Sequence, residues 1–170
     1  MESRIIRLFI FLIFFVVIAN NSYGFASPSK DLFATKYLNA DVDSSIIKSL
    51  DDMNKMLATK DLQKIMSVFE DGEDIMLVGS DSGEVYIGRE QIEEFFKMIV
   101  SLPFVFSFEM NILSVNQINN TGWFFGEGKM IHTRPDGKVT FVPYRITAIL
   151  VKKGNEWKWK VFSGAIPRGE

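Results

Sequence analysis

The chain has 170 residues, of which 47% are hydrophobic, and its formal net charge is -2. This length is typical of one domain, and the apolar content is enough for a sizeable core. A slightly acidic chain has no basic field to attract a polyanion, so we expect no nucleic-acid partner. The sequence contains no cysteine, which excludes disulfides, thiol catalysis and thiolate metal sites.

The first residues have the pattern of a targeting segment. Arg4 and Arg7 precede an apolar run at 8–18, and small residues follow up to Ala26. The run is shorter than the ~20 residues that a membrane-spanning helix needs. We therefore expect 1–26 to be a signal peptide cleaved near Ala26, which predicts an exported protein, periplasmic or secreted, with no stable membrane span after cleavage. An uncleaved anchor is the alternative.

Three helices are expected after an irregular leader arm at 27–43. Apolar residues recur at helical spacing over 46–57 and again over 62–69, where Asp61 can cap the second helix. The third helix is predicted over 89–102, because Pro103 stops it.

Strands make up most of the remaining chain. A short hairpin is expected at 74–79 and 84–87, before the third helix, with turn residues between its strands. From 104 onward apolar and polar residues alternate, which indicates half-buried strands. Four long consecutive strands are predicted at 104–112, 123–133, 139–151 and 156–166. Helices followed by an antiparallel meander indicate an α+β fold, with the helices on one face of the sheet.

Three segments resemble the SnoaL-like branch of the nuclear transport factor 2-like (NTF2-like) superfamily: 79–90, Tyr144 to Thr147, and 157–167. The resemblance covers 44–167, which we take as one domain. It implies a cone-shaped roll in which the N-terminal helices pack against a strongly curved antiparallel sheet, with a pocket at the open end. Family members include isomerases, cyclases, dehydratases, epoxide hydrolases and non-catalytic binding or dimerisation modules, so the fold does not decide the function.

The last strand departs from the family pattern at two positions. Many members place a His six residues after a Trp, a Ser two residues further, and a closing Pro. Counted from Trp157 to Pro167, these positions hold Ser163 and Ala165. The last strand therefore lacks the imidazole that could act as a base near neutral pH, which counts against catalysis.

Candidate ligand-pocket residues lie on the last three strands and on the short hairpin. They are Trp159, Ser163, Arg145, Glu127 and Tyr86. If Ser163 faces the cavity, the period of two puts Trp157 and Trp159 on the same face, as a pocket wall or as ordinary core.

Glu127 and Arg145 fall almost opposite each other across the predicted turn at 134–137. They form either a cross-strand ion pair or a buried acid and guanidinium that orient a ligand. The parity of each strand is open, so the faces could be reversed.

Catalytic candidates are weak. Glu127 and Asp74 are possible acid–base carboxylates, and Tyr86 and Tyr144 are possible donors by analogy with ketosteroid-isomerase relatives. The lone His132 lies near a turn, where we expect it to be solvated. No metal-site spacing and no cofactor motif is present, so we expect neither a metal nor a cofactor.

We expect a domain that binds a small apolar or amphipathic molecule in the cone. One alternative is an isomerase, dehydratase or cyclase that uses Glu127 or Asp74 as its acid–base group. The other is an interaction module that forms a homodimer through the outer face of the sheet.

Overall fold

The computed structural model describes residues 44–167. The predicted signal peptide and the leader arm lie outside these residues. The described part contains α2 (Ser45–Thr59), α3 (Leu62–Ser67), α4 (Arg89–Ser101) and the strands β1 (Met76–Val78), β2 (Val85–Ile87), β3 (Val105–Ile118), β4 (Thr121–Thr133), β5 (Val139–Lys153) and β6 (Glu156–Ala165).

The helices begin near the residues that the sequence predicts, and they bury the predicted apolar faces. The buried residues of α2 include Ile46, Leu50 and Leu57, which belong to one apolar stripe. The carboxylate of Asp61 accepts hydrogen bonds from the Gln63 and Lys64 amides at 3.0 and 3.2 Å, as the capping prediction requires.

The sheet has six strands in the order β2-β1-β6-β5-β4-β3. All neighbouring strands are antiparallel except β1 and β6, which are parallel. The expectation of a wholly antiparallel sheet is wrong at this one pair. The parallel direction of this pair is already set at Phe69, which forms a parallel bridge with Trp159 before β1 begins.

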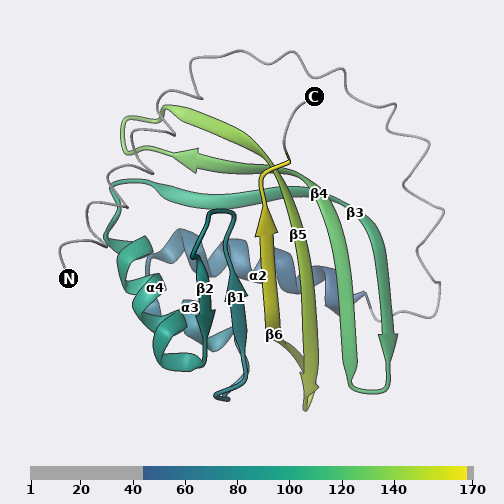
Figure 1. Ribbon diagram of the computed structural model, residues 1–170. Helices are drawn as coiled ribbons and strands as arrows, with labels where there is room; N and C mark the ends of the chain where they lie inside the picture. The colour runs from purple at the N-terminus through teal and green to yellow at the C-terminus, as the bar shows by residue number, and fades with distance from the viewer. Residues whose placement is uncertain (1–43, 168–170) are drawn as a thin grey trace. The chain divides into compact units, whose positions relative to one another are not determined.

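The long strands bend sharply, so that their far ends extend over the helices (Figure 1). Two features of the strands permit this bend. Irregularities at Leu113 of β3 and at Lys160 of β6 each insert one residue into the pairing. In β4, a side chain on Gly128 would overlap the carbonyl oxygen of Glu109, so only glycine lets β3 approach so closely.

Helix α2 is fixed to the edge of this sheet by a side-chain amide. Asn54 donates to the carbonyl of Phe108 and accepts from its amide, each at 2.8 Å. Phe108 lies on β3, an edge strand with backbone groups that lack a neighbouring strand. The helices cover one face of the sheet, which we call the inner face, and the outer face points away from them (Figure 1).

Candidate functional site

Five aromatic side chains form a row along the helix-covered inner face of the sheet. Their ring centroids are 5.6 to 6.1 Å apart in the order Phe124, Trp159, Phe162, Phe108 and Tyr144. The row begins in the core, where Trp159 and Phe124 are 0% exposed, and it reaches Phe108, which is half-buried. We call these five residues the aromatic row.

Tyr144 brings a buried hydroxyl group to the end of the aromatic row. Burial, with a smaller contribution from the carboxylate of Glu84, raises the pKa of Tyr144 to about 12, and a hydrogen bond with Ser80 acts in the opposite direction. A side chain on Gly164 would overlap the Tyr144 hydroxyl, so the phenol occupies space that only glycine leaves open. The phenol stays protonated at neutral pH and can donate one hydrogen bond.

His132 is buried, which corrects the expectation of a solvated residue. It is 8% exposed and contacts Phe104 and Phe106, with ring centroids 5.4 and 4.7 Å away. Phe106 lies directly opposite it on β3, and the curved sheet turns both side chains inward. Burial lowers the pKa of His132 to about 4, so the imidazole is neutral near pH 7.

Ser163 does not share the face of Trp159, so the expected alternation along the last strand is wrong beyond Lys160. Trp157 and Trp159 are buried, but the extra residue at Lys160 shifts the parity, and Phe162 is then the next buried side chain. Ser163 is half-buried and pairs with the exposed Thr147 of β5. A bulge moves every later side chain of the strand to the other face.

Glu127 and Arg145 form the predicted cross-strand pair, on the outer face of the sheet. The two residues are register partners of β4 and β5, and Arg145 Nε and Nη2 donate to Glu127 Oε1 at 3.0 and 2.8 Å. The side chain of Arg145 is 47% exposed and that of Glu127 is 45% exposed. The pair therefore lies outside, away from the aromatic row.

Asp74 and Tyr86 are also apart from the aromatic row. The Asp74 side chain is 78% exposed, and its pKa is lowered mainly by a hydrogen bond from Lys160. Tyr86 is half-buried on β2 and contacts Phe95 of α4, with ring centroids 4.9 Å apart. The acid–base alternative requires a carboxylate buried in the cavity, and both Asp74 and Glu127 are instead exposed to solvent.

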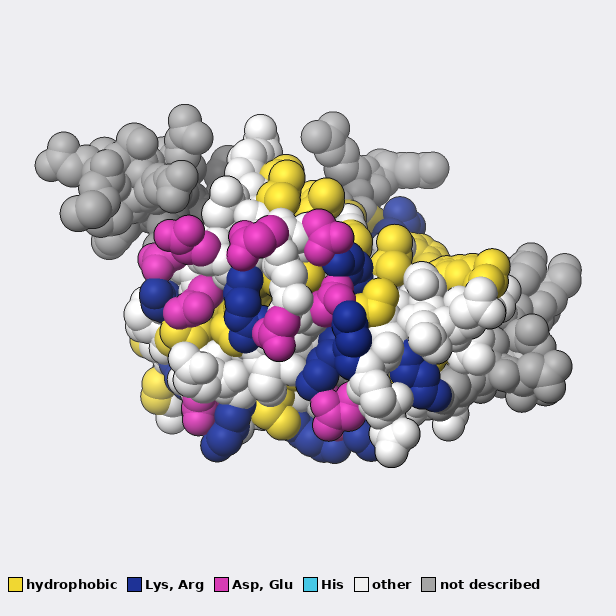
Figure 2. All heavy atoms as spheres, turned by 90° about the horizontal axis from the view of Figure 1, so that it is seen from below, with side chains coloured by type: hydrophobic (Ala, Val, Ile, Leu, Met, Phe, Trp, Pro, Cys, Tyr) yellow, Lys and Arg dark blue, Asp and Glu magenta, His cyan; other side chains and the backbone are white. Residues whose placement is uncertain are grey.

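A concave site of a different kind, the polar pocket, lies at the end of α3 and has a volume of about 510 Å³. It is lined by Gln63, Ser67, Phe69, Glu70, Asp71, Arg89, Lys153 and Lys158. On the face of the molecule seen from below, cationic and acidic side chains lie close to one another (Figure 2). Sequence reasoning missed this pocket, because its residues come from four separate segments.

Glu70 is the innermost ionised group of this region. Its side chain is 12% exposed, and its two oxygens bind Lys153 at 2.6 Å and Lys160 at 2.7 Å. The hydrogen bonds from Lys153 and Lys160 lower the pKa of Glu70. Among residues 44–167 no group of three or more His, Asp and Glu side chains could hold a metal ion, and no helix there could cross a membrane.

The model of the SnoaL-like domain matches residues 46–167 of the chain. The chain belongs to the SnoaL-like family. A search of curated protein sequences found no match. The family membership agrees with the α+β fold described above, and the resemblance of the sequence to the SnoaL-like family is confirmed.

Solved structures with this fold have diverse descriptions. A candidate calcium/calmodulin-dependent protein kinase II association domain from Xanthomonas campestris is 24% identical, covering 79% of this chain and 95% of that one, with a TM-score of 0.63. A candidate NTF2-like dehydratase from Streptomyces avermitilis is 11% identical, covering 74% and 97%, with a TM-score of 0.64. An NTF2-like protein of unknown function from Pseudomonas putida KT2440 is 15% identical, covering 74% and 87%, with a TM-score of 0.60. At these identities the likeness shows the fold alone.

In this SnoaL-like domain, the two positions that depart from the family pattern lie away from the aromatic row. Ser163 pairs with Thr147, and Ala165 is exposed and pairs with Arg145. Tyr144 and His132 do bring buried polar groups to the inner face. The family pattern in the last strand therefore does not identify the polar groups of this interior.

Proposed function

We propose that this SnoaL-like domain binds a small amphipathic molecule against the inner face of its sheet, beside Phe106 and Phe108. One observation carries the proposal: these two phenylalanines belong to the inner face yet remain half-buried, and the ring of Phe108 stacks on the buried Tyr144. Binding sites for small molecules combine aromatic walls with a few placed polar groups. This end of the aromatic row has that composition.

The polar groups favour a ligand with a neutral hydrogen-bond acceptor. Tyr144 keeps its proton and can donate to a carbonyl or hydroxyl oxygen. The nearby carboxylate of Glu84 disfavours negative charge at the phenol, and for the same reason it disfavours an anionic ligand group. His132 is neutral near pH 7 and adds no positive charge to attract one.

Native mass spectrometry of the protein purified from its own host tests this proposal. We expect a retained neutral molecule, identified by its mass, that binds again after extraction. Tyr144→Phe should weaken this binding about fivefold to tenfold, the usual worth of one hydrogen bond. Phe141→Ala, on the outer face, is the matched control and should bind normally. A wild-type protein that retains no molecule, and binds none of a panel of neutral aromatic ketones and alcohols, would contradict the proposal.

We also propose that the protein is exported and that its signal peptide is removed near Ala26. The support is the sequence pattern at 1–26, where Arg4 and Arg7 precede an apolar run that ends in small residues. N-terminal sequencing of the protein from fractionated host cells should read Ser27 as the first residue, in the periplasm or the medium. A cytoplasmic protein that still begins at Met1 would overturn this proposal.

A second candidate function is homodimerisation through the outer face of the sheet. Phe141, Val139 and Ile149 of β5 are 65%, 55% and 38% exposed, although they are large apolar side chains. Such groups on one face favour a protein partner. Tyr144, on the opposite face of the same strand, is 4% exposed, so the exposed apolar groups of β5 lie on its outer face.

Analytical ultracentrifugation tests the homodimer directly. We expect a dimer at micromolar concentration, shifted toward monomer by Phe141→Asp, whereas Lys138→Asp in the nearby turn should leave the dimer intact. A protein that stays monomeric at the highest accessible concentration would exclude this function.

A further inference from the structure

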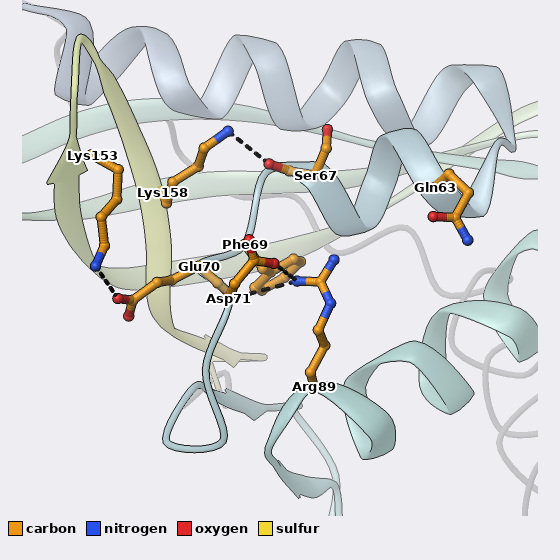
Figure 3. Close-up of a pocket in the computed structure, with 8 residues that line it drawn as sticks. All are labelled: Gln63, Ser67, Phe69, Glu70, Asp71, Arg89, Lys153 and Lys158. Carbon is orange, nitrogen blue, oxygen red and sulfur yellow. Dashed lines mark hydrogen bonds and ion pairs between the residues drawn. The ribbon is translucent and has the colours of Figure 1, made fainter.

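The cations of the polar pocket are held in position by main-chain carbonyls at the end of α3. Lys158 Nζ donates to the carbonyl of Ser67 at 2.9 Å. Arg89 Nη1 and Nη2 donate to the carbonyls of Glu70 and Met66, each at 3.4 Å. Figure 3 shows the two side chains approaching the end of α3 from different elements, Lys158 from β6 and Arg89 from α4. Each cation therefore has a main-chain partner in addition to its acidic one.

The carboxylates that neutralise these two cations are exposed. Asp71 binds Arg89 at 2.8 Å with a side chain that is 91% exposed, and Glu156 binds Lys158 at 2.6 Å with a side chain that is 70% exposed. The cations themselves are only 32% and 26% exposed. Exposed ion pairs contribute little to stability, so a competing anion can displace Asp71 or Glu156 at small cost.

Glu70, the other acidic residue that lines the pocket, is not available for such an exchange. Glu70 is 12% exposed and already binds Lys153 and Lys160 through separate oxygens. It compensates the charge of these two lysines. An anionic ligand can thus neutralise Arg89 and Lys158 without disturbing the ion pairs of Glu70.

From this arrangement we infer that the polar pocket binds the oxyanion group, phosphate or carboxylate, of a small solute. Arg89 presents a planar guanidinium that suits two oxygens of one anion, and Lys158 adds a point charge. The exposed amide of Gln63 lies on the same wall and can donate to the ligand. This site is separate from the aromatic row and does not depend on the ligand proposed there.

The exposed carboxylate of Asp71 provides a discriminating test. If Asp71 competes with the ligand for Arg89, Asp71→Asn should tighten anion binding about threefold, because the competing pair is weak. If Arg89 and Lys158 serve only to satisfy the carbonyls of α3, the same substitution should create no anion binding. Arg89→Gln and Lys158→Gln should each weaken binding tenfold or more, and Arg134→Gln, a remote exposed arginine, should not change it.

The experiment is a titration of the purified full-length chain with inorganic phosphate and, separately, with acetate, followed by NMR and calorimetry. We expect saturable shifts of the Arg89 side-chain and Ser67 amide signals with at least one of the two anions, and the two arms distinguish a phosphate from a carboxylate site. Thermal unfolding shows whether each variant is folded. If Arg89→Gln does not fold, Asp71→Asn still tests the inference. Absence of saturable shifts in both the wild type and Asp71→Asn would overturn the inference.

Discussion

The inner and outer faces of β4 and β5 differ, although the same two strands supply both. Phe124, Tyr144 and Ile146 point to the helices and are almost fully buried, whereas Phe141 and Arg145 lie on the other face and are exposed. The alternation along each strand defines two faces, but the helices decide which one becomes core. The interior thus holds His132 and Tyr144, whose pKa values are shifted by burial, and the outer face carries the exposed ion pair of Glu127 and Arg145.

The two faces should differ most in the stability that is lost when an aromatic side chain is replaced by alanine. Trp159→Ala removes a side chain that is 0% exposed and should lower the free energy of unfolding by about 3–5 kcal/mol. Phe141→Ala, at a position 65% exposed, should change it by less than about 0.5 kcal/mol. Urea unfolding under identical conditions measures both values. Similar losses for the two variants would mean that the outer face is also covered.

A pH-dependent loss of stability is expected from the inner face. His132 has a pKa of about 4 in the folded protein and an ordinary value of 6.5, so the unfolded chain binds the extra proton first as the pH falls. Stability should therefore drop between pH 6.5 and 4, by up to about 3 kcal/mol. His132→Gln should remove this slope between pH 6.5 and 5, above the range in which the carboxylates titrate. Equal slopes for wild type and variant would refute the assignment.

The close approach of Tyr144 to Gly164 predicts an intermediate effect. Gly164→Ala places a methyl group against the phenol and should cost about 1–3 kcal/mol, because an overpacked core must shift. Ala165→Ser, at the exposed neighbouring position, is the matched control and should be nearly neutral. Thermal unfolding compares them. A Gly164→Ala protein as stable as the control would show that the interior at Tyr144 has spare room.

The smallest effect is expected at the ion pair of the outer face. Glu127→Gln should cost about 0–1 kcal/mol, since both side chains are nearly half exposed. A double-mutant cycle with Arg145→Gln isolates the pair, and 1 M salt should reduce its coupling energy. A coupling energy well above this range would indicate that the pair is shielded from solvent, as it would be inside a dimer interface.

Local patterns in the sequence predicted most of the fold. The apolar stripe of α2, the cap at Asp61 and the four long strands follow from spacing alone, and each is confirmed. The opposition of Glu127 and Arg145 also follows, because a tight turn fixes the register of the strands that it joins. These features depend on residues that are close in the sequence or linked by one turn.

The tertiary structure decided the features that depend on distant segments. Trp159 pairs with Phe69, and Val161 pairs with Met76 of β1. The bulge at Lys160 lies between these two contacts, at the point where the loop 70–75 leaves the sheet. No local period can reveal that insertion, and it is the reason that Ser163 lies on the face opposite the one expected. The burial of His132 and the polar pocket at α3 have the same origin: each combines side chains from separate elements, brought together only by the curvature of the sheet and the packing of the helices.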